Sequence, residues 1–321
     1  MEFKGIHKFY ICLIVGFLIV GSIFTYSQLF SSKRIVSPLP GFLTAFVNDQ
    51  VSTLSLWLPI LKMLNPDPSD IAPLVSAKAA LVYDLSEQKA LFSKNPKERF
   101  PMASLTKIMT AIIALESPKE GDRYAVTQAD LVGENSMGLS GGEIFSLEEL
   151  TYGLILTSGN DAAETLASNY PVGRDKFIEA MNNKAKSLGL ESTHFTNPTG
   201  LEGDGQQYTT AYDLLVITKY AMRFPLFKTV VGTFDYHIPY SNNHKEFYLE
   251  NETNLLTSYP GVIGVKDGYT PEAGLCLVTF LNYKNHKIIG IILGSDNRRQ
   301  EMKDLLDYGL RIQGITPPPH E

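Results

Sequence analysis

Three strand-like segments near the end of the chain are joined by short turns, and they constrain the fold more than any other feature. They cover residues 262–265, 275–281 and 287–293. Strands joined in this way pair antiparallel, because parallel strands need a long crossover connection. Earlier in the chain, residues 79–84 and 90–93 flank a polar turn and predict a hairpin. The sequence therefore predicts an antiparallel sheet with strands from both ends of one domain.

Helical apolar spacing fills the region between these strands. Helices are expected over residues 104–116, 146–157, 161–169, 174–188 and 210–223, with a last helix over 298–312. Two more strand candidates, 234–239 and 246–249, flank an asparagine-rich turn. We therefore predict an α+β fold, in which helices flank an antiparallel β-sheet and form a helical subdomain.

Composition excludes several classes of protein. The 321 residues, of which 44% are hydrophobic and 19% charged, suit one large or two ordinary globular domains. A net charge of −6 argues against a nucleic-acid partner. The two cysteines, Cys12 and Cys276, lie in different kinds of segment, so we expect no disulfide between them. No zinc-binding spacing is present, and neither a metal nor another cofactor is predicted.

An uncharged run over residues 9–26 bears on location. It follows Lys4 and Lys8 and is at the short end of a membrane span, although a cleaved signal peptide would look similar. We favour an uncleaved transmembrane anchor, because no clear cleavage site follows. The basic flank would keep residues 1–8 in the cytoplasm and place the rest outside the cell membrane. If the run is cleaved, the protein is secreted.

The remaining chain divides into a connecting region, a domain and a tail. Residues 27–73 contain proline-rich loop signals and predict a linker or membrane-proximal region. Within it, residues 42–64 could form an amphipathic helix on the membrane or a short helix packed on the domain. The folded domain is expected over residues 74–315, with a tail over 316–321.

A nucleophile and a candidate base lie at the start of an expected helix. Ser104 and Lys107 are three residues apart, so they share a helix face. A serine hydroxyl needs an adjacent base, and lysine can serve only if burial or positive charge lowers its pKa. The apolar residues 108–115 suggest burial. The spacing alone is weak, because Ser86 and Lys89 repeat it in a turn, and a helix-terminal serine with a surface lysine would look the same.

Two further segments could complete an acyl-transfer site, which also needs a proton relay, an oxyanion hole and substrate contacts. Ser158 and Asn160 lie in a tight turn between two helical patterns, where they could bond a lysine and a substrate amide. Lys266 and Gly268 come at the end of a strand. There the lysine could hold an anion or lower the pKa of Lys107, and the glycine allows close approach of a ligand.

In this order, the Ser-x-x-Lys, Ser-x-Asn and Lys-x-Gly motifs resemble those of the penicillin-binding serine DD-peptidases. The closest likeness is to the D-alanyl-D-alanine carboxypeptidases of low molecular mass. The matching segments are 101–107, 156–163, 195–201, 209–214, 264–274 and 305–309. The resemblance implies a β-lactamase/DD-peptidase-like fold, peptidoglycan stem peptides as substrates and β-lactams as covalent inhibitors.

The resemblance also implies a role for each matching position. Ser104 would attack the carbonyl of the penultimate D-Ala and form an acyl-enzyme, and Lys107 would take its proton. Ser158 would relay a proton to the leaving nitrogen, and Asn160 would orient Lys107 and the substrate amide. The backbone N–H groups of Ser104 and Tyr269 would form the oxyanion hole.

The leaving-group end of the site departs from the family pattern. Lys266 would supply positive charge, and Arg298 or Arg299 could bind a substrate carboxylate or be a surface charge. The family usually has threonine or serine where this chain has Asp267, and that hydroxyl donates to the terminal carboxylate of the substrate. Three outcomes remain open. Asp267 pairs with a cation and is tolerated, the substrate is an internal cross-link, or the site binds muropeptides with poor turnover.

Several functions therefore compete. One is a DD-carboxypeptidase or endopeptidase. Another is a non-catalytic wall-binding protein on the same scaffold, and Asp267 is the one residue that favours this alternative. A serine β-lactamase is disfavoured, because the nearest match to its Glu-x-x-Leu-Asn segment, Glu179 to Asn183, lacks the leucine. A Ser–His–Asp hydrolase is disfavoured, because no Gly-x-Ser-x-Gly elbow is present.

Overall fold

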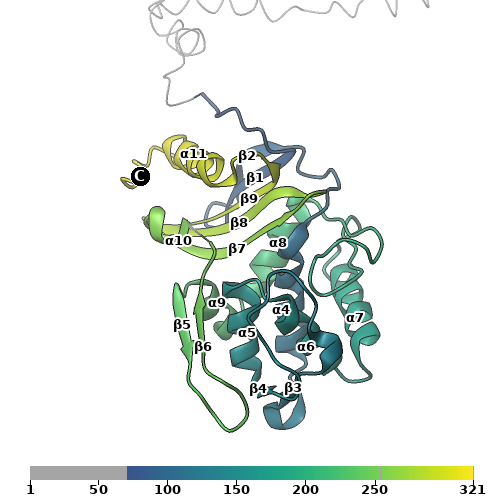
Figure 1. Cartoon of the computed structure of the whole chain (residues 1–321). Coiled ribbons are helices and arrows are strands. Elements are labelled where there is room, and N and C mark those ends of the chain that lie inside the picture. The colour runs from purple at the N-terminus through teal and green to yellow at the C-terminus, as the bar shows by residue number, and fades with distance from the viewer. Residues whose placement is uncertain (1–70, 254, 321) are drawn as a thin grey trace, which may run out of the picture. The chain divides into compact units, whose positions relative to one another are not determined.

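The structure, a computed structural model, describes residues 71–253 and 255–320. Within these residues it confirms the α+β class. The main sheet is antiparallel with the order β2-β1-β9-β8-β7. Its edge strand β7 adjoins the helical region (Figure 1). Its strands are β1 (Ala79–Asp84), β2 (Lys89–Lys94), β7 (Val262–Thr270), β8 (Gly274–Tyr283) and β9 (His286–Ser295).

The sheet is buried on both faces. Leu81 packs into the larger core beneath the sheet, whereas its neighbour Val82 packs beneath α11 (Arg298–Arg311). This division follows from the geometry of a strand, in which successive side chains point to opposite faces. It also explains why β9 carries an almost continuous apolar run.

The predicted helices are all present, with ends that differ by at most two residues. They are α4 (Thr106–Glu116), α5 (Leu147–Leu156), α6 (Asn160–Ser168), α7 (Arg174–Ser187), α8 (Ala211–Ala221) and α11. The sequence reading missed two short helices and a small strand pair: α9 (Pro225–Val231), α10 (Leu255–Ser258), β3 (Tyr124–Ala125) and β4 (Ile144–Phe145). The two strands predicted around the asparagine-rich turn are present as β5 (Asp235–Ile238) and β6 (Phe247–Glu250), which pair antiparallel.

Helix α4 is the centre of the helical region. All its residues from Thr106 to Ala114 are buried, so it has no solvent-facing side over this length. Ser104 does not belong to it, contrary to prediction. A short 3₁₀ turn, η2 (Ala103–Leu105), precedes α4 and carries the serine. The serine therefore lies at the rim of the helical region while Lys107 lies inside it.

Strand β7 corrects a second prediction. The sequence places Lys266 and Gly268 at the end of a strand, but β7 continues to Thr270 and pairs both residues with β8. The apolar pattern stops early because aspartate and glycine are poor strand formers. Pairing with β8 extends the strand regardless, so Lys266 lies inside an edge strand.

Among residues 71–253 and 255–320, no helix combines the length and apolar character needed to cross a membrane. The predicted anchor over residues 9–26 and nearly all of the predicted linker over 27–73 lie outside the described residues.

The register of β7 depends on a bulge at Gly264. The pairing with β8 shifts between Val262 and Val265, and Gly264 has a φ of +102°. A Cβ on this residue would lie 2.3 Å from the carbonyl oxygen of Val231. We expect Gly264→Ala to lower the free energy of unfolding by about 3 kcal/mol, through backbone strain and overpacking together. Urea unfolding measures the loss.

Gly121→Ala is the matched control, because Gly121 has a φ of +75° but open space around a built Cβ. It should lose only the backbone contribution of about 1 kcal/mol. Equal losses in the two variants would show that the contact with Val231 carries no energy.

Candidate active site

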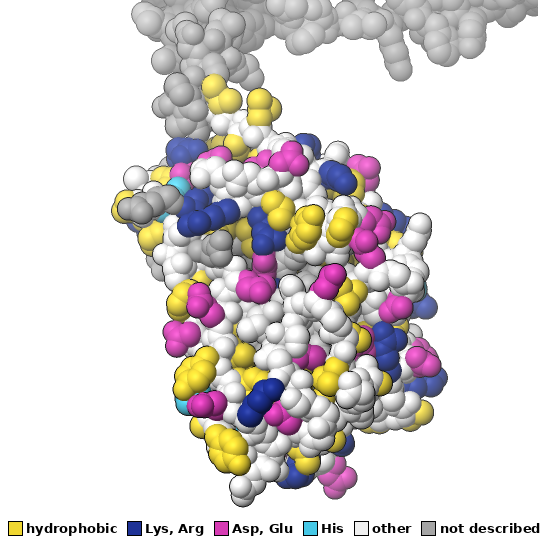
Figure 2. Space-filling view, in the orientation of Figure 1, with side chains coloured by type: hydrophobic (Ala, Val, Ile, Leu, Met, Phe, Trp, Pro, Cys, Tyr) yellow, Lys and Arg dark blue, Asp and Glu magenta, His cyan; other side chains and the backbone are white. Residues whose placement is uncertain are grey.

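A cleft of about 810 Å³ lies between β7 and the helical region. Seven of the predicted site residues line it: Ser104, Ser158, Asn160, Asp267, Gly268, Tyr269 and Arg298. The other two, Lys107 and Lys266, are fully buried behind its walls. In Figure 2, acidic side chains lie around the middle of this face, and basic side chains lie above them toward the sheet and α11. The structure thus brings all nine positions together.

The backbone of β7 approaches η2 closely. A Cβ built on Gly268 would lie only 2.9 Å from the backbone nitrogen of Ser104. Only glycine allows this distance, because real Cβ atoms do not approach a backbone nitrogen so closely. The turn is itself strained, since Ala103 has a φ of +48°. Ser104 and Tyr269, whose backbone N–H groups are expected to form the oxyanion hole, both line the cleft.

Lys107 has no exposed surface, and its amine has three polar neighbours. The Nζ atom lies 3.0 Å from Ser104 Oγ, 2.6 Å from Asn160 Oδ1 and 2.8 Å from the carbonyl oxygen of Thr199. Burial holds the pKa of Lys107 well below its usual range, and the positive charge of Lys266 lowers it further. Nearby carboxylates, including Asp267, oppose the shift without reversing it. The amine is therefore poised to be uncharged.

The donors around Lys107 can be assigned one by one. Asn160 Nδ2 donates to the carbonyl oxygen of Glu134 at 2.7 Å, which turns Asn160 Oδ1 toward the lysine. That oxygen and the Thr199 carbonyl can only accept, so they take both N–H groups of a neutral amine. The remaining lone pair faces Ser104 Oγ. The arrangement can therefore accept the proton of the serine hydroxyl.

Ser158 lies in the turn between α5 and α6. Its φ of +55° is unusual for a residue other than glycine. Its Oγ atom is buried at the cleft wall and has no hydrogen-bonding partner among the described residues. A hydroxyl so placed is available to a substrate.

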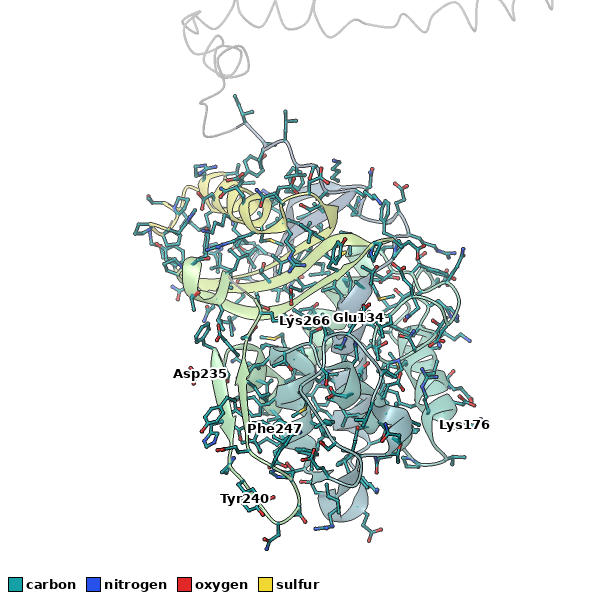
Figure 3. All side chains as sticks on the ribbon, in the orientation of Figure 1. Glu134, Lys176, Asp235, Tyr240, Phe247 and Lys266 are labelled. Carbon is teal, nitrogen blue, oxygen red and sulfur yellow. The ribbon has the colours of Figure 1, made fainter. Side chains whose placement is uncertain are left out.

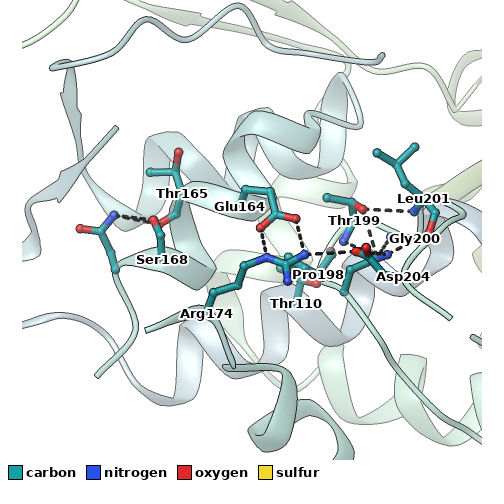
Figure 4. A network of polar contacts seen from close by, with 12 residues as sticks. Thr110, Glu164, Thr165, Ser168, Arg174, Pro198, Thr199, Gly200, Leu201 and Asp204 are labelled. Carbon is teal, nitrogen blue, oxygen red and sulfur yellow. Dashed lines mark hydrogen bonds and ion pairs between the residues drawn. The ribbon is translucent and has the colours of Figure 1, made fainter. Parts of the chain in front are cut away.

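The loop that supplies the Thr199 carbonyl is held by a polar network (Figure 4). Asn197 Oδ1 accepts from the backbone nitrogens of Thr199 and Gly200, and Thr110 donates to the carbonyl of Pro198 at 2.6 Å. Gly200 has a φ of +88°, and a Cβ there would lie 2.0 Å from the carbonyl oxygen of Ala103. The loop therefore packs directly on the turn that carries the nucleophile.

Asp161 is a positioning residue that the sequence reading missed. Its carboxylate is buried and accepts from Ser136 Oγ at 2.5 Å and from the backbone nitrogens of Met137, Gly138 and Leu139 at 3.0–3.1 Å. It thereby fixes the loop whose Glu134 carbonyl orients Asn160. The only sequence signal is an aspartate in the first turn of α6, which is common at helix N-termini for other reasons.

A second polar cluster lies on the sheet side of the cleft, where Figure 3 labels Lys266. Asp267 accepts from Lys266 Nζ at 2.8 Å through one oxygen and from Arg298 Nη2 at 2.5 Å through the other. Burial would raise the pKa of Asp267, but the two cations hold it below its ordinary value. Of the two candidate arginines, Arg298 lines the cleft, and Arg299 lines only a small cavity beside it.

Glu252 joins this end of the cleft and was also missed. It follows β6, lines the cleft with Asp267 and Arg298, and is partly solvent-exposed. Desolvation raises the pKa of its carboxyl group, and Asp267 adds to that shift against the opposing effect of Lys266. Among the described residues, no group of His, Cys, Asp and Glu side chains is arranged to hold a metal ion.

Comparison with known proteins now decides the family. The model of the S11 peptidase family, described as D-alanyl-D-alanine carboxypeptidase, matches residues 67–297. This chain belongs to that family. It is therefore related to serine DD-peptidases, whose substrates are peptidoglycan peptides and which bind β-lactams.

Individual relatives are moderately similar to this family member. The D-alanyl-D-alanine carboxypeptidase DacF of Bacillus subtilis (strain 168) is 34% identical over 241 residues, which cover 72% of this chain and only 61% of DacF. A D-alanyl-D-alanine endopeptidase of Pseudomonas aeruginosa is 33% identical over 70% of this chain and 74% of its own. The crystal structure of the Streptomyces K15 DD-transpeptidase matches with a TM-score of 0.71 and 31% identity, over 75% of this chain and 99% of that one.

Removing the Asp161 carboxylate should loosen the wall of the cleft. We expect Asp161→Ala to lower the free energy of unfolding by about 3 kcal/mol, because several buried donors lose their acceptor. Urea unfolding gives the loss. Asp175→Ala is the matched control, since Asp175 also lies in the first turn of a helix but is exposed. Asp175→Ala should lower the free energy of unfolding by less than about 1 kcal/mol. A similar loss in both variants would contradict the positioning role of Asp161.

The pH dependence of acylation should respond to Lys266. The base works only when Lys107 is neutral, so acylation rises with pH through the pKa of Lys107. Removing the positive charge of Lys266 raises that pKa, so in Lys266→Gln the rise should move to higher pH. Acylation rates with a fluorescent penicillin, measured across pH, test this. Lys89→Gln removes an exposed lysine on β2 and should leave the profile in place. An unmoved profile in Lys266→Gln would refute the electrostatic account.

Proposed function

We propose that this chain is a serine D-alanyl-D-alanine carboxypeptidase that acts on peptidoglycan stem peptides through an acyl-enzyme on Ser104. One observation carries the proposal. The amine of a fully buried lysine lies 3.0 Å from a serine hydroxyl on the wall of a cleft and within hydrogen-bonding distance of two carbonyl oxygens. Membership of the family supports the same chemistry.

The proposed acylation gives each of these groups a role. Ser104 Oγ attacks the carbonyl carbon of the penultimate D-Ala as its proton passes to Lys107 Nζ. The carbonyl oxygen becomes negative and accepts from the backbone N–H groups of Ser104 and Tyr269. The C–N bond then breaks as Lys107 passes a proton to Ser158, whose own proton goes to the leaving nitrogen. Free D-Ala departs, and Asn160 holds the amine and the substrate amide in place.

Deacylation uses the same base. A water molecule attacks the ester carbonyl and gives a proton to Lys107, which returns it to Ser104 Oγ as the ester bond breaks. The products are the free enzyme and a stem peptide shortened by one residue. No cofactor enters either step.

A DD-endopeptidase is the second candidate, and one observation favours it. The cations that could bind a terminal carboxylate are already paired with Asp267. The same pairing is the only support for a catalytically impaired peptidoglycan-binding protein. A serine β-lactamase has no support, because Glu179 pairs with Lys176 on α7 and is absent from the described residues that line the cleft.

Location is part of the proposal. Stem peptides lie outside the cytoplasm, and the uncharged run over residues 9–26 would hold the catalytic domain at the outer face of the cytoplasmic membrane. This anchor would keep the enzyme close to newly made peptidoglycan.

Covalent labelling tests the nucleophile. We expect Ser104→Ala to abolish labelling by a fluorescent penicillin and to lower release of D-Ala from a pentapeptide by at least about 10³-fold. Ser86→Ala is the matched control, because Ser86 belongs to the second Ser-x-x-Lys sequence but lies in the β1–β2 turn. It should label and release D-Ala like the wild type. Persistent labelling of Ser104→Ala would refute the proposal.

A further inference from the structure

Asp267 forms ion pairs with Lys266 and Arg298, the two cations at the leaving-group end of the cleft. Its carboxylate bonds to Lys266 at 2.8 Å and to Arg298 at 2.5 Å, so both oxygens are engaged. Arg298 Nη1 donates in turn to the carbonyl oxygens of Gly268 at 2.7 Å and Cys276 at 3.4 Å. Both cations therefore have a carboxylate partner before any substrate arrives, although the single negative charge of Asp267 offsets only one of their two positive charges.

The other described residues of the cleft lining add negative charge and no further positive charge. Among the described residues that line the cleft, Arg298 is the one basic residue. Four acidic residues line the same cleft: Glu134, Glu202, Glu252 and Asp267. A carboxylate entering here meets like charges and an arginine that is already paired.

We propose that Asp267 acts as a built-in carboxylate that selects against leaving groups with a free carboxylate next to the scissile nitrogen. The inference rests on the proposed acyl-transfer function and names its preferred leaving groups. These are amines whose neighbouring carboxyl group is amidated, or side-chain amines of a cross-linked peptide that have no such carboxyl group. A terminal D-Ala with a free carboxylate remains a substrate, but a poor one.

Position and charge both support this role. Asp267 lies on the edge strand β7 between Lys266 and Gly268, and Gly268 packs against the backbone nitrogen of Ser104. Asp267 therefore lines the same cleft as Ser104, and its carboxylate is held by a cation at each of its two oxygens. The neighbouring cations keep its pKa low, so it is charged at neutral pH. For a substrate carboxylate to bind, Arg298 or Lys266 would have to leave a partner that is already in place.

A pair of substrates tests the inference. Two pentapeptides with the same stem end in D-Ala-D-Ala, one with a free carboxylate and the other with a primary carboxamide. Chromatography of released D-Ala or D-alaninamide gives kcat/KM for each. We expect the wild type to cleave the carboxamide at least about tenfold faster. A wild type that cleaves the free acid tenfold faster would overturn the inference without any variant.

Variants assign the selectivity to one side chain. In Asp267→Thr the ratio of amide to acid should fall at least about tenfold, mainly through faster cleavage of the acid. Asp267→Asn keeps the size of the side chain and should shift the ratio in the same direction if the threonine variant folds poorly. Asp235→Asn removes an exposed carboxylate from β5 and should leave the ratio unchanged.

The outcomes separate the two proposals. If neither peptide is cleaved and penicillin does not label the protein, the acyl-transfer function fails. If both are cleaved at a ratio that is the same in the wild type and in both Asp267 variants, the function stands and the role of Asp267 fails.

Discussion

A buried lysine amine that forms no ion pair with the described residues governs the arrangement of the rest of the site. Burial favours its neutral form, and a neutral amine still needs acceptors for its two N–H groups. Asn160 and Thr199 provide them from positions 53 and 92 residues further along the chain. The lone pair that remains is directed at Ser104. Three segments therefore have to meet at one nitrogen atom, which explains why the loops around α4 are fixed by so many buried polar contacts.

The two buried lysines of the cleft are used in opposite ways. Both are fully shielded from solvent, but Lys107 faces carbonyl oxygens whereas Lys266 faces a carboxylate. A carbonyl oxygen accepts from an amine without requiring it to be charged, whereas Asp267 places a negative charge directly beside Lys266. The positive charge of Lys266 also lowers the pKa of Lys107. Asp267 therefore affects both the charge at the leaving-group end of the cleft and the electrostatic environment that determines the pKa of Lys107.

The sequence predicts the elements well and the contacts only in part. The apolar spacing of α4 predicts both a helix and the burial of Lys107, because periodicity is a local property. The Thr199 carbonyl was missed because a backbone acceptor has no signature in the side chains. The sequence does not identify the arginine that pairs with Asp267, because Arg298 is 31 residues away. Only the fold of the sheet determines which arginine lies beside the carboxylate. Asp161 was missed for the same reason.

The left-handed backbone at Ala103 and Ser158 has a consequence for how this domain could change over time. Ala103 directly precedes the nucleophile Ser104, and Ser158 lines the cleft. Glycine would adopt the positive φ angle at either position with less backbone strain. A population of sequences selected for thermal robustness alone would drift toward glycine at both positions. At position 158 that drift would remove the hydroxyl that has no partner among the described residues. Thermal stability and catalytic activity therefore favour different residues at this one position.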